Sequence, residues 1–160
     1  IKFTNPQVLF SEGSADITSH FQTILVDFIP KYLSVVLQEK YKNKIAEIRI
    51  EGHTDTKPIK RIGDPYIDNM VLSQDRARNV LAFLRTQNCF NNLQPIEKER
   101  LQYWLTANGL SYGRAVDKNY KISFDSKEPI DNEKSRRVEF RIVTTSEAII
   151  KEALKNIDNK

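Results

Sequence analysis

The chain has 160 residues, which is about the size of one globular domain with a hydrophobic core. Hydrophobic residues make up 39% and charged residues 29%, with only 5 Gly and 6 Pro, which argues against a disordered or collagen-like chain. The 25 Lys and Arg exceed the 21 Asp and Glu by only +4, and the two signs are interleaved, so nothing requires a nucleic-acid partner. We therefore expect a single folded domain over residues 1–160.

The chain has too few cysteines and histidines for a disulfide-bonded domain or a zinc-binding domain. Cys89 has no second cysteine to pair with, and with two histidines it is too little for a Cys/His zinc site. We therefore expect no metal and no cofactor. No apolar run reaches the roughly 18 residues that span a bilayer. The chain begins at Ile1 without a start methionine or signal peptide, so we expect a segment of a longer protein whose anchor lies elsewhere.

The N-terminal quarter predicts a short strand and a long helix. Residues 7–10 are apolar and β-prone, and residues 11–14 have turn chemistry. A Ser-x-x-Gln capping box then precedes apolar residues at helical spacing, which predicts an amphipathic helix from Ser19 to about Tyr41. Pro30 lies inside this helix and is expected to bend or split it, because proline removes a backbone donor.

The next segment predicts a strand, a long loop and a helix. Residues 44–51 alternate apolar and polar side chains, as in a half-buried strand. Residues 53–72 lack periodicity and contain two prolines, so they are interpreted as a loop, and loops of this length are often functional. Ser73 is expected to cap a helix that extends to about Gln87.

The C-terminal half completes an α+β or α/β sandwich. The expected elements are a helical turn or two in 96–103, a strand at 104–107, a short hairpin arm at 120–124 within an irregular stretch, a strand at 137–143, and an amphipathic helix over about 146–157. Strands alternating with helices predict a mixed sheet of about four strands with helices packed on one face.

Two charged residues bracket the long loop and suggest a ligand. Asp55 follows a strand and can bind an ammonium, and Arg76 is expected in the first turn of the second helix. There the helix N-terminus and the guanidinium together favour a carboxylate. An acid and a base held apart in this way suit a zwitterion such as the head of an amino acid.

Three separated blocks of the sequence resemble one family. These are Gly52-His53-Thr54-Asp55, then Asn69-x-x-Leu72-Ser73-x-x-Arg76-Ala77-x-x-Val80, then Arg136-Arg137-Val138-Glu139-Phe140-Arg141-Ile142. Their order and their strand, loop and helix context are similar to the OmpA-like peptidoglycan-binding domain. This family includes outer-membrane porins, peptidoglycan-associated lipoproteins and MotB-type stator subunits of ion-driven motors.

The resemblance implies a βαβαβ sandwich that binds peptidoglycan without catalysis. The ligand is then the diaminopimelate residue of the stem peptide, with its ammonium on Asp55 and its carboxylate on Arg76. Asn69 is expected to brace the loop, Leu72 to line the pocket, and Arg136 to add a second cationic contact. Thr54, beside Asp55, completes the expected set. Arg137 is expected to point away, because neighbours on a strand face opposite sides.

Some features depart from the usual pattern of the family. Ser135 stands where an asparagine is usual, which leaves one local hydrogen bond in doubt, and the stretches 56–68 and 118–133 are long. The Thr56-Lys57-Pro58-Ile59 run resembles the MotB-type branch. It favours a periplasmic, inner-membrane-anchored stator subunit, flagellar or phage-defence in type, over a lipoprotein or a porin as the parent protein. Such a subunit is expected to act as a homodimer beside a membrane partner subunit.

Other interpretations remain open from the residues alone. His53 suggests a metal ligand, and Asp55, Asp64, Asp68 and Asn69 suggest a calcium loop, although neither has the usual ligand spacing. The alternative functions are a protein-interaction domain with a lapsed pocket and a cell-wall hydrolase. The hydrolase lacks a recognisable metal set, Cys-His pair or pair of carboxylates.

Overall fold

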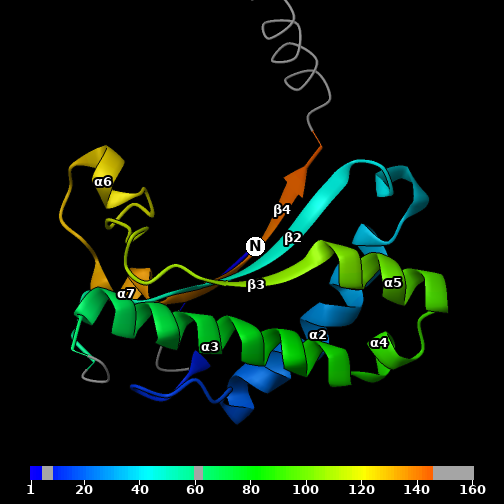
Figure 1. Ribbon diagram of the computed structural model, residues 1–160, viewed down its shortest axis with the longest axis horizontal. Helices are drawn as coiled ribbons and strands as arrows, with labels where there is room; N and C mark the ends of the chain where they lie inside the picture. The colour runs from blue at the N-terminus through cyan, green and yellow to red at the C-terminus, as the bar shows by residue number, and fades with distance from the viewer. Residues whose placement is uncertain (5–8, 60–62, 146–160) are drawn as a thin grey trace, which may run out of the picture.

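A computed structural model describes residues 1–4, 9–59 and 63–145 (Figure 1). The elements in chain order are β1 (Lys2–Phe3), α2 (Ser19–Val36), the 3-10 turn η1 (Glu39–Tyr41), β2 (Ile45–His53), α3 (Pro65–Thr86), α4 (Asn88–Asn91), α5 (Pro95–Trp104), β3 (Leu105–Gly109), α6 (Ser123–Ser126), α7 (Asn132–Ser135) and β4 (Arg137–Thr144). None of the helices in these ranges is long and apolar enough to cross a membrane.

The four strands form one mixed sheet in the order β1-β4-β2-β3. β2 pairs in parallel with β3 and antiparallel with β4, and β4 pairs antiparallel with β1. The helices α2 and α3 lie together on one face of this sheet (Figure 1). The expected mixed four-stranded sheet with helices on one face is confirmed.

Alternation along the strands divides the two faces of the sheet. Ile48 and Ile50 of β2 and Val138 and Phe140 of β4 are fully or almost fully buried among the helices. Phe140 packs edge-on against Phe28 and Tyr32 of α2, with ring centroids 5.1 and 5.4 Å apart. The intervening strand residues point to the opposite face, where polar side chains collect.

The helix α3 begins at Pro65, eight positions before the expected start at Ser73. Asp64 caps it by accepting hydrogen bonds from the N–H groups of Tyr66 and Ile67 at 2.9 and 3.3 Å, and proline suits the first helical position. The predicted loop over 53–72 was therefore too long. Ser73 lies inside the helix, where its hydroxyl donates to the carbonyl of Met70 and accepts from the N–H of Ser111.

Two glycines let α3 lie against the sheet. A Cβ on Gly52 of β2 would overlap the carbonyl oxygen of Ser73, and a Cβ on Gly109 of β3 would overlap the backbone of Gln74. The Gln74 side chain also bonds the edge of β3, since it accepts from the N–H of Gly109 at 2.7 Å and donates to the carbonyl of Ala107 at 3.0 Å. This close approach fixes α3 relative to the ends of β2 and β3.

Several predicted boundaries were wrong at the N-terminal end. The first helix ends at Val36 and not near Tyr41, and it passes Pro30 without a split. Its cap is Thr18, whose side chain accepts from the N–H of Phe21. The strand that joins the sheet is Lys2–Phe3. Of the strand predicted at 7–10, Phe10 forms only an isolated bridge with Ile17, and residues 7 and 8 lie outside the described residues.

Differences at the C-terminal half concern short elements. The third strand runs from Leu105 to Gly109, after a helix that is longer than the predicted turn or two. The predicted hairpin arm at 120–124 is wrong, because only one bridge forms there, between Val116 and Ile122, and α6 follows. The strand predicted at 137–143 is confirmed as β4. The predicted C-terminal helix lies outside the described residues.

Candidate functional site

A cavity of about 450 Å³ lies where the loops after Phe10, after β2 and before β4 meet the helix α3. Its lining residues are Phe10, Glu12, Gly13, Thr54, Asp55, Lys57, Pro58, Ile59, Asn69, Leu72, Arg76 and Arg136. The six residues predicted to bind the ligand are among them. The fold therefore brings three blocks that are far apart in sequence to one cavity, of a size common for small-molecule sites.

Asp55 and Arg136 form an ion pair at the wall of this cavity. Asp55 follows the end of β2, and Arg136 directly precedes the antiparallel strand β4, so the pairing of the two strands brings them together. The Arg136 Nη1 atom donates to Asp55 Oδ2 at 2.7 Å, with 27% of the Arg136 side chain and 6% of the Asp55 side chain exposed. Asp55 Oδ1 accepts from the backbone N–H of Lys57 at 3.1 Å.

Arg76 lies in the interior of α3, which corrects its expected place in a first helical turn. Pro65 and Arg76 are 76 − 65 = 11 positions apart, whereas the field of a helix N-terminus fades within the first turn. The helix dipole therefore gives no support to a ligand carboxylate here. Arg76 instead donates to the carbonyls of Ser14 and Ser11 at 2.9 and 3.4 Å, and its guanidinium lies 4.8 Å from the ring centre of Phe10.

Asn69 joins α3 to the loop after β2. Its amide donates to the carbonyls of Lys57 and Pro65, each at 3.0 Å. The Asn69 Oδ1 and Thr54 Oγ1 atoms are buried, and neither has a hydrogen-bond partner among the described residues. Leu72 is also buried and contributes an apolar surface to the cavity.

Lys57 and Glu12 form a second ion pair at the cavity, which the sequence did not predict. The Lys57 Nζ atom lies 2.9 Å from Glu12 Oε1, and both side chains are largely exposed. The hydrogen bond and the charge of Lys57 lower the pKa of the Glu12 carboxyl. Because the partners are 45 positions apart in two loops without periodicity, no local sequence signal marks this pair.

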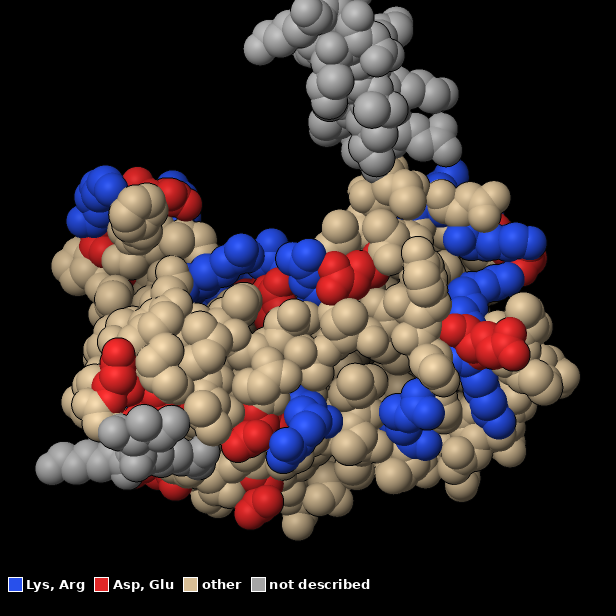
Figure 2. Space-filling view, viewed as in Figure 1, with Lys and Arg blue, Asp and Glu red and all other residues tan. Residues whose placement is uncertain are grey.

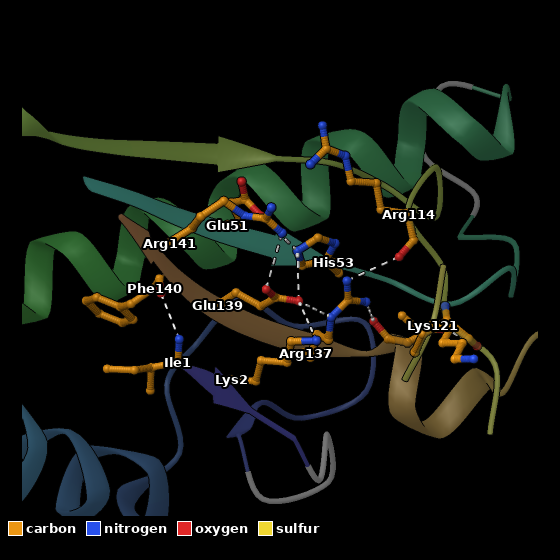
Figure 3. A network of polar contacts seen from close by, with 12 residues as sticks. Ile1, Lys2, Glu51, His53, Arg114, Lys121, Arg137, Glu139, Phe140 and Arg141 are labelled. Atoms are coloured by element: carbon orange, nitrogen blue, oxygen red, sulfur yellow. Dashed lines mark hydrogen bonds and ion pairs between the residues drawn. The ribbon is translucent and has the colours of Figure 1, made fainter. Parts of the chain in front are cut away.

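The polar face of the sheet holds a separate, buried cluster (Figure 3). Ligand atoms of Glu51, His53 and Glu139 lie within 4.8 Å of one another, a spacing open to a metal. However, Arg137 Nε lies 2.6 Å from Glu139 Oε1, and Arg141 Nε lies 3.2 Å from Glu51 Oε2. These guanidinium groups already neutralise both carboxylates, so a divalent cation would have to displace them. We interpret the cluster as an internal ion-pair network.

The protonation of this network follows from burial and from its arginines. Burial lowers the pKa of His53 below 6.5, because it disfavours the charged imidazolium, while Glu51 at 3.5 Å opposes the shift. Burial alone would raise the pKa of Glu139, but Arg137 outweighs it and holds that pKa below 4.5. The favoured state is a neutral imidazole between two carboxylates paired with arginines.

The surface around these two regions carries both signs of charge. On the visible face, Lys and Arg side chains lie close to Asp and Glu side chains, and the molecule is hollowed above the middle of the sheet (Figure 2).

Ser135, which replaces the usual asparagine, is buried and keeps a local bond, since its hydroxyl accepts from the N–H of Val116 at 2.9 Å. That departure leaves the start of β4 anchored.

Comparisons with known proteins agree with this architecture. Zorya protein ZorB of Escherichia coli (strain ATCC 8739) is 34% identical over 158 residues, which cover 96% of this chain and 61% of that protein. The chain thus spans less than two thirds of this curated relative.

Solved structures give the same picture. The periplasmic domain of Helicobacter pylori MotB has a TM-score of 0.58 at 19% identity, with coverage of 99% of this chain and 85% of that chain. The cell wall anchor of the T6SS from Pseudomonas aeruginosa has a TM-score of 0.52 at 22% identity, with coverage of 90% and 80%. At such identities these two likenesses establish the fold. The family model described as the OmpA family matches residues 9–122, well over half of the sequence, and the chain belongs to that family.

Proposed function

We propose that this domain binds peptidoglycan without turnover and anchors a larger protein to the cell wall. The observation that carries the proposal is the cavity in which Asp55, Arg76 and Arg136 meet on three separate segments. The similarity to the cell wall anchor of the T6SS and to the MotB periplasmic domain supports the same function. The diaminopimelate residue of the stem peptide, whose side chain ends in a zwitterion, is the proposed ligand.

The acceptors beside Asp55 suit the ammonium of that zwitterion. An ammonium has three N–H donors. Asp55 provides a carboxylate, and Thr54 Oγ1 and Asn69 Oδ1 are buried oxygens without a hydrogen-bond partner in the described part of the chain. A ligand ammonium would pair with Asp55, and the buried oxygens of Thr54 and Asn69 would accept from it only if the groups that cover them moved aside.

The cations across the cavity suit the carboxylate. Arg136 lies against Asp55, and Arg76 is held at the cavity by the carbonyls of Ser11 and Ser14. Guanidinium groups bind carboxylates with planar, paired hydrogen bonds. Because Arg136 contacts Asp55 directly, it can bridge that residue to the ligand carboxylate.

The parent protein is proposed from the relatives. The MotB and ZorB similarities support a stator-type subunit with a periplasmic wall-binding domain, held at the inner membrane beside a partner subunit. Residues 1–160 would then act as one such domain. Two copies in one assembly would increase the effective concentration of wall contacts, and a homodimer remains our prediction.

Sedimentation with insoluble peptidoglycan tests the binding. Asp55→Asn and Arg76→Gln are each expected to weaken binding by about 2–5 kcal/mol, because each leaves a ligand charge without its partner. Lys42→Gln, which removes a lysine paired with Glu39 away from the cavity, serves as the matched control. Wild-type binding by both cavity variants would contradict the proposal, as would release of muropeptides during the assay.

Selectivity between two wall chemistries tests the identity of the ligand. A stem peptide with lysine in place of diaminopimelate keeps the side-chain ammonium and lacks the neighbouring carboxylate. Its affinity by calorimetry is expected to fall markedly, because the cavity arginines then lose their partner. Equal affinity for the two peptides would show that the arginines do not bind this carboxylate.

A further inference from the structure

The cavity has more cationic than anionic side chains. Among the described lining residues, the cations are Lys57, Arg76 and Arg136, and the anions are Glu12 and Asp55, so three positive charges face two negative ones. The zwitterionic end of diaminopimelate is neutral, so binding it leaves this excess of positive charge among the described lining residues unchanged. A ligand with one additional carboxylate would offset it.

The backbone of Lys57 is fixed by two residues of the proposed site. Its N–H donates to Asp55 Oδ1 at 3.1 Å, and its carbonyl accepts from Asn69 Nδ2 at 3.0 Å. Asp55 and Asn69, which would also bind the ligand, therefore fix the backbone from which the Lys57 side chain extends. The Lys57 side chain remains 67% exposed, so it can reach a ligand without leaving a buried position.

The ammonium of Lys57 is paired with the carboxylate of Glu12. The loop that carries Glu12 is tied to α3, because Arg76 holds the carbonyls of Ser11 and Ser14, and Asn79 holds the carbonyl of Ala15 at 2.8 Å. The ion pair with Lys57 thus connects that loop to the loop after β2 at the cavity. An exposed pair of this kind is weak and opens readily.

We propose that Lys57 binds a second carboxylate of the ligand, namely the free α-carboxylate of the γ-linked D-glutamyl residue that precedes diaminopimelate in the stem peptide. This inference rests on the proposed function and makes it more specific. The γ-linkage uses the side-chain carboxyl for the peptide bond and leaves the α-carboxylate free as a branch, on the residue directly before diaminopimelate. Glu12 competes with it for the same ammonium, and the ligand carboxylate replaces Glu12 on binding.

Two synthetic stem peptides test this assignment by calorimetry at constant ionic strength. One has the free glutamyl carboxylate, and the other has its neutral carboxamide; both contain diaminopimelate. The wild-type domain is expected to prefer the carboxylate peptide by roughly 1.5-fold to fivefold, the range of an exposed ion pair. In Lys57→Gln the ratio of the two affinities should fall to about one. In Glu12→Gln both peptides should still bind, and the carboxylate peptide should bind more tightly than it binds the wild-type domain, because Glu12 no longer competes for Lys57.

Lys42→Gln is the matched control, because Lys42 is an exposed lysine that pairs with Glu39 at 3.5 Å outside the cavity. It should keep the wild-type preference. A wild-type ratio near one, or the same preference in Lys57→Gln, would overturn the role of Lys57 while diaminopimelate binding stands. Failure of the wild-type domain to bind either peptide would overturn the proposed function and this inference together. Unchanged circular dichroism shows that each variant is folded.

Discussion

Two polar regions lie on either side of the end of β2, and their charged side chains differ in exposure to solvent. His53 belongs to the buried network, and Asp55, two residues later, belongs to the cavity. In the network, His53, Glu51, Arg137 and Glu139 are each less than 5% exposed. In the cavity, the side chains of Lys57 and Glu12 are 67% and 86% exposed.

This difference separates stability from binding. The network pairs its charges internally, so it holds the strands together but offers little to a ligand. The cavity combines the buried carboxylate of Asp55 with the exposed ammonium of Lys57, so its charges suit an external ligand. Variants in the first region should mainly change the free energy of unfolding, and variants in the second should mainly change affinity.

The largest effect on stability is expected from Arg137→Gln. The Arg137 side chain is 1% exposed, and it holds Glu139 at 2.6 Å and the carbonyls of Ser135 and Arg114, each at 3.2 Å. Removing one partner of a buried ion pair leaves an uncompensated charge and costs about 3–5 kcal/mol. Chemical denaturation measures the loss.

Asp55→Asn is the matched comparison for this prediction. The variant is expected to lower the stability far less than Arg137→Gln, because Arg136, the ion-pair partner of Asp55, is partly exposed. Its binding to peptidoglycan should nevertheless weaken as proposed above. Equal losses of stability in the two variants would remove the distinction between the regions.

Gly52→Ala should affect both regions at once, because Gly52 lies in β2 beside α3. Its Cβ would overlap the carbonyl oxygen of Ser73, so the helix must move away from the strand. Overpacking of this kind typically costs about 1–3 kcal/mol. The shift also displaces Asn69 and Arg76 on α3, so weaker binding should accompany the lower stability in denaturation and sedimentation. An unchanged unfolding midpoint would show that the helix does not depend on this contact.

The sequence predicted the parts of the fold that have a regular apolar period. Apolar and polar residues alternate over residues 46–51 of β2 and over residues 137–142 of β4, and the C-terminal half of α3 has apolar residues at helical spacing. The N-terminal half of α3 was not predicted as a helix, because its buried face carries Asp68, Asn69 and Ser73. Hydropathy therefore shows no helical period there. The pair Asp64-Pro65 was the available signal, as a cap followed by a proline at the first helical position.

The candidate site was predictable only where strand and helix motifs fixed its residues. Thr54, Asp55 and Arg136 adjoin strands, and the motif of α3 includes Asn69, Leu72 and Arg76, so their meeting at one cavity follows from the fold. Lys57 and Glu12 escaped prediction because loop contacts depend on the final path of the chain. For the same reason, alternation placed Arg137 opposite Arg136 but did not identify its partners.

The smallest expected effect is a pH dependence of stability that originates in the network. The pKa of His53 is lowered in the folded protein by burial, so below about pH 6.5 the unfolded chain binds more protons than the folded one. Stability should therefore fall as the pH decreases from that value to the folded pKa, with a slope of at most about 1.4 kcal/mol per pH unit. The pKa values of Glu51 and Glu139 are also lowered, so their contribution to stability is lost only below about pH 4.5.

His53→Gln should flatten the pH dependence of the free energy of unfolding between pH 7.5 and 5, and the loss of stability at lower pH should remain. The exposed His20→Gln controls for removal of an imidazole, and equal flattening in both variants would contradict the assignment to the buried histidine.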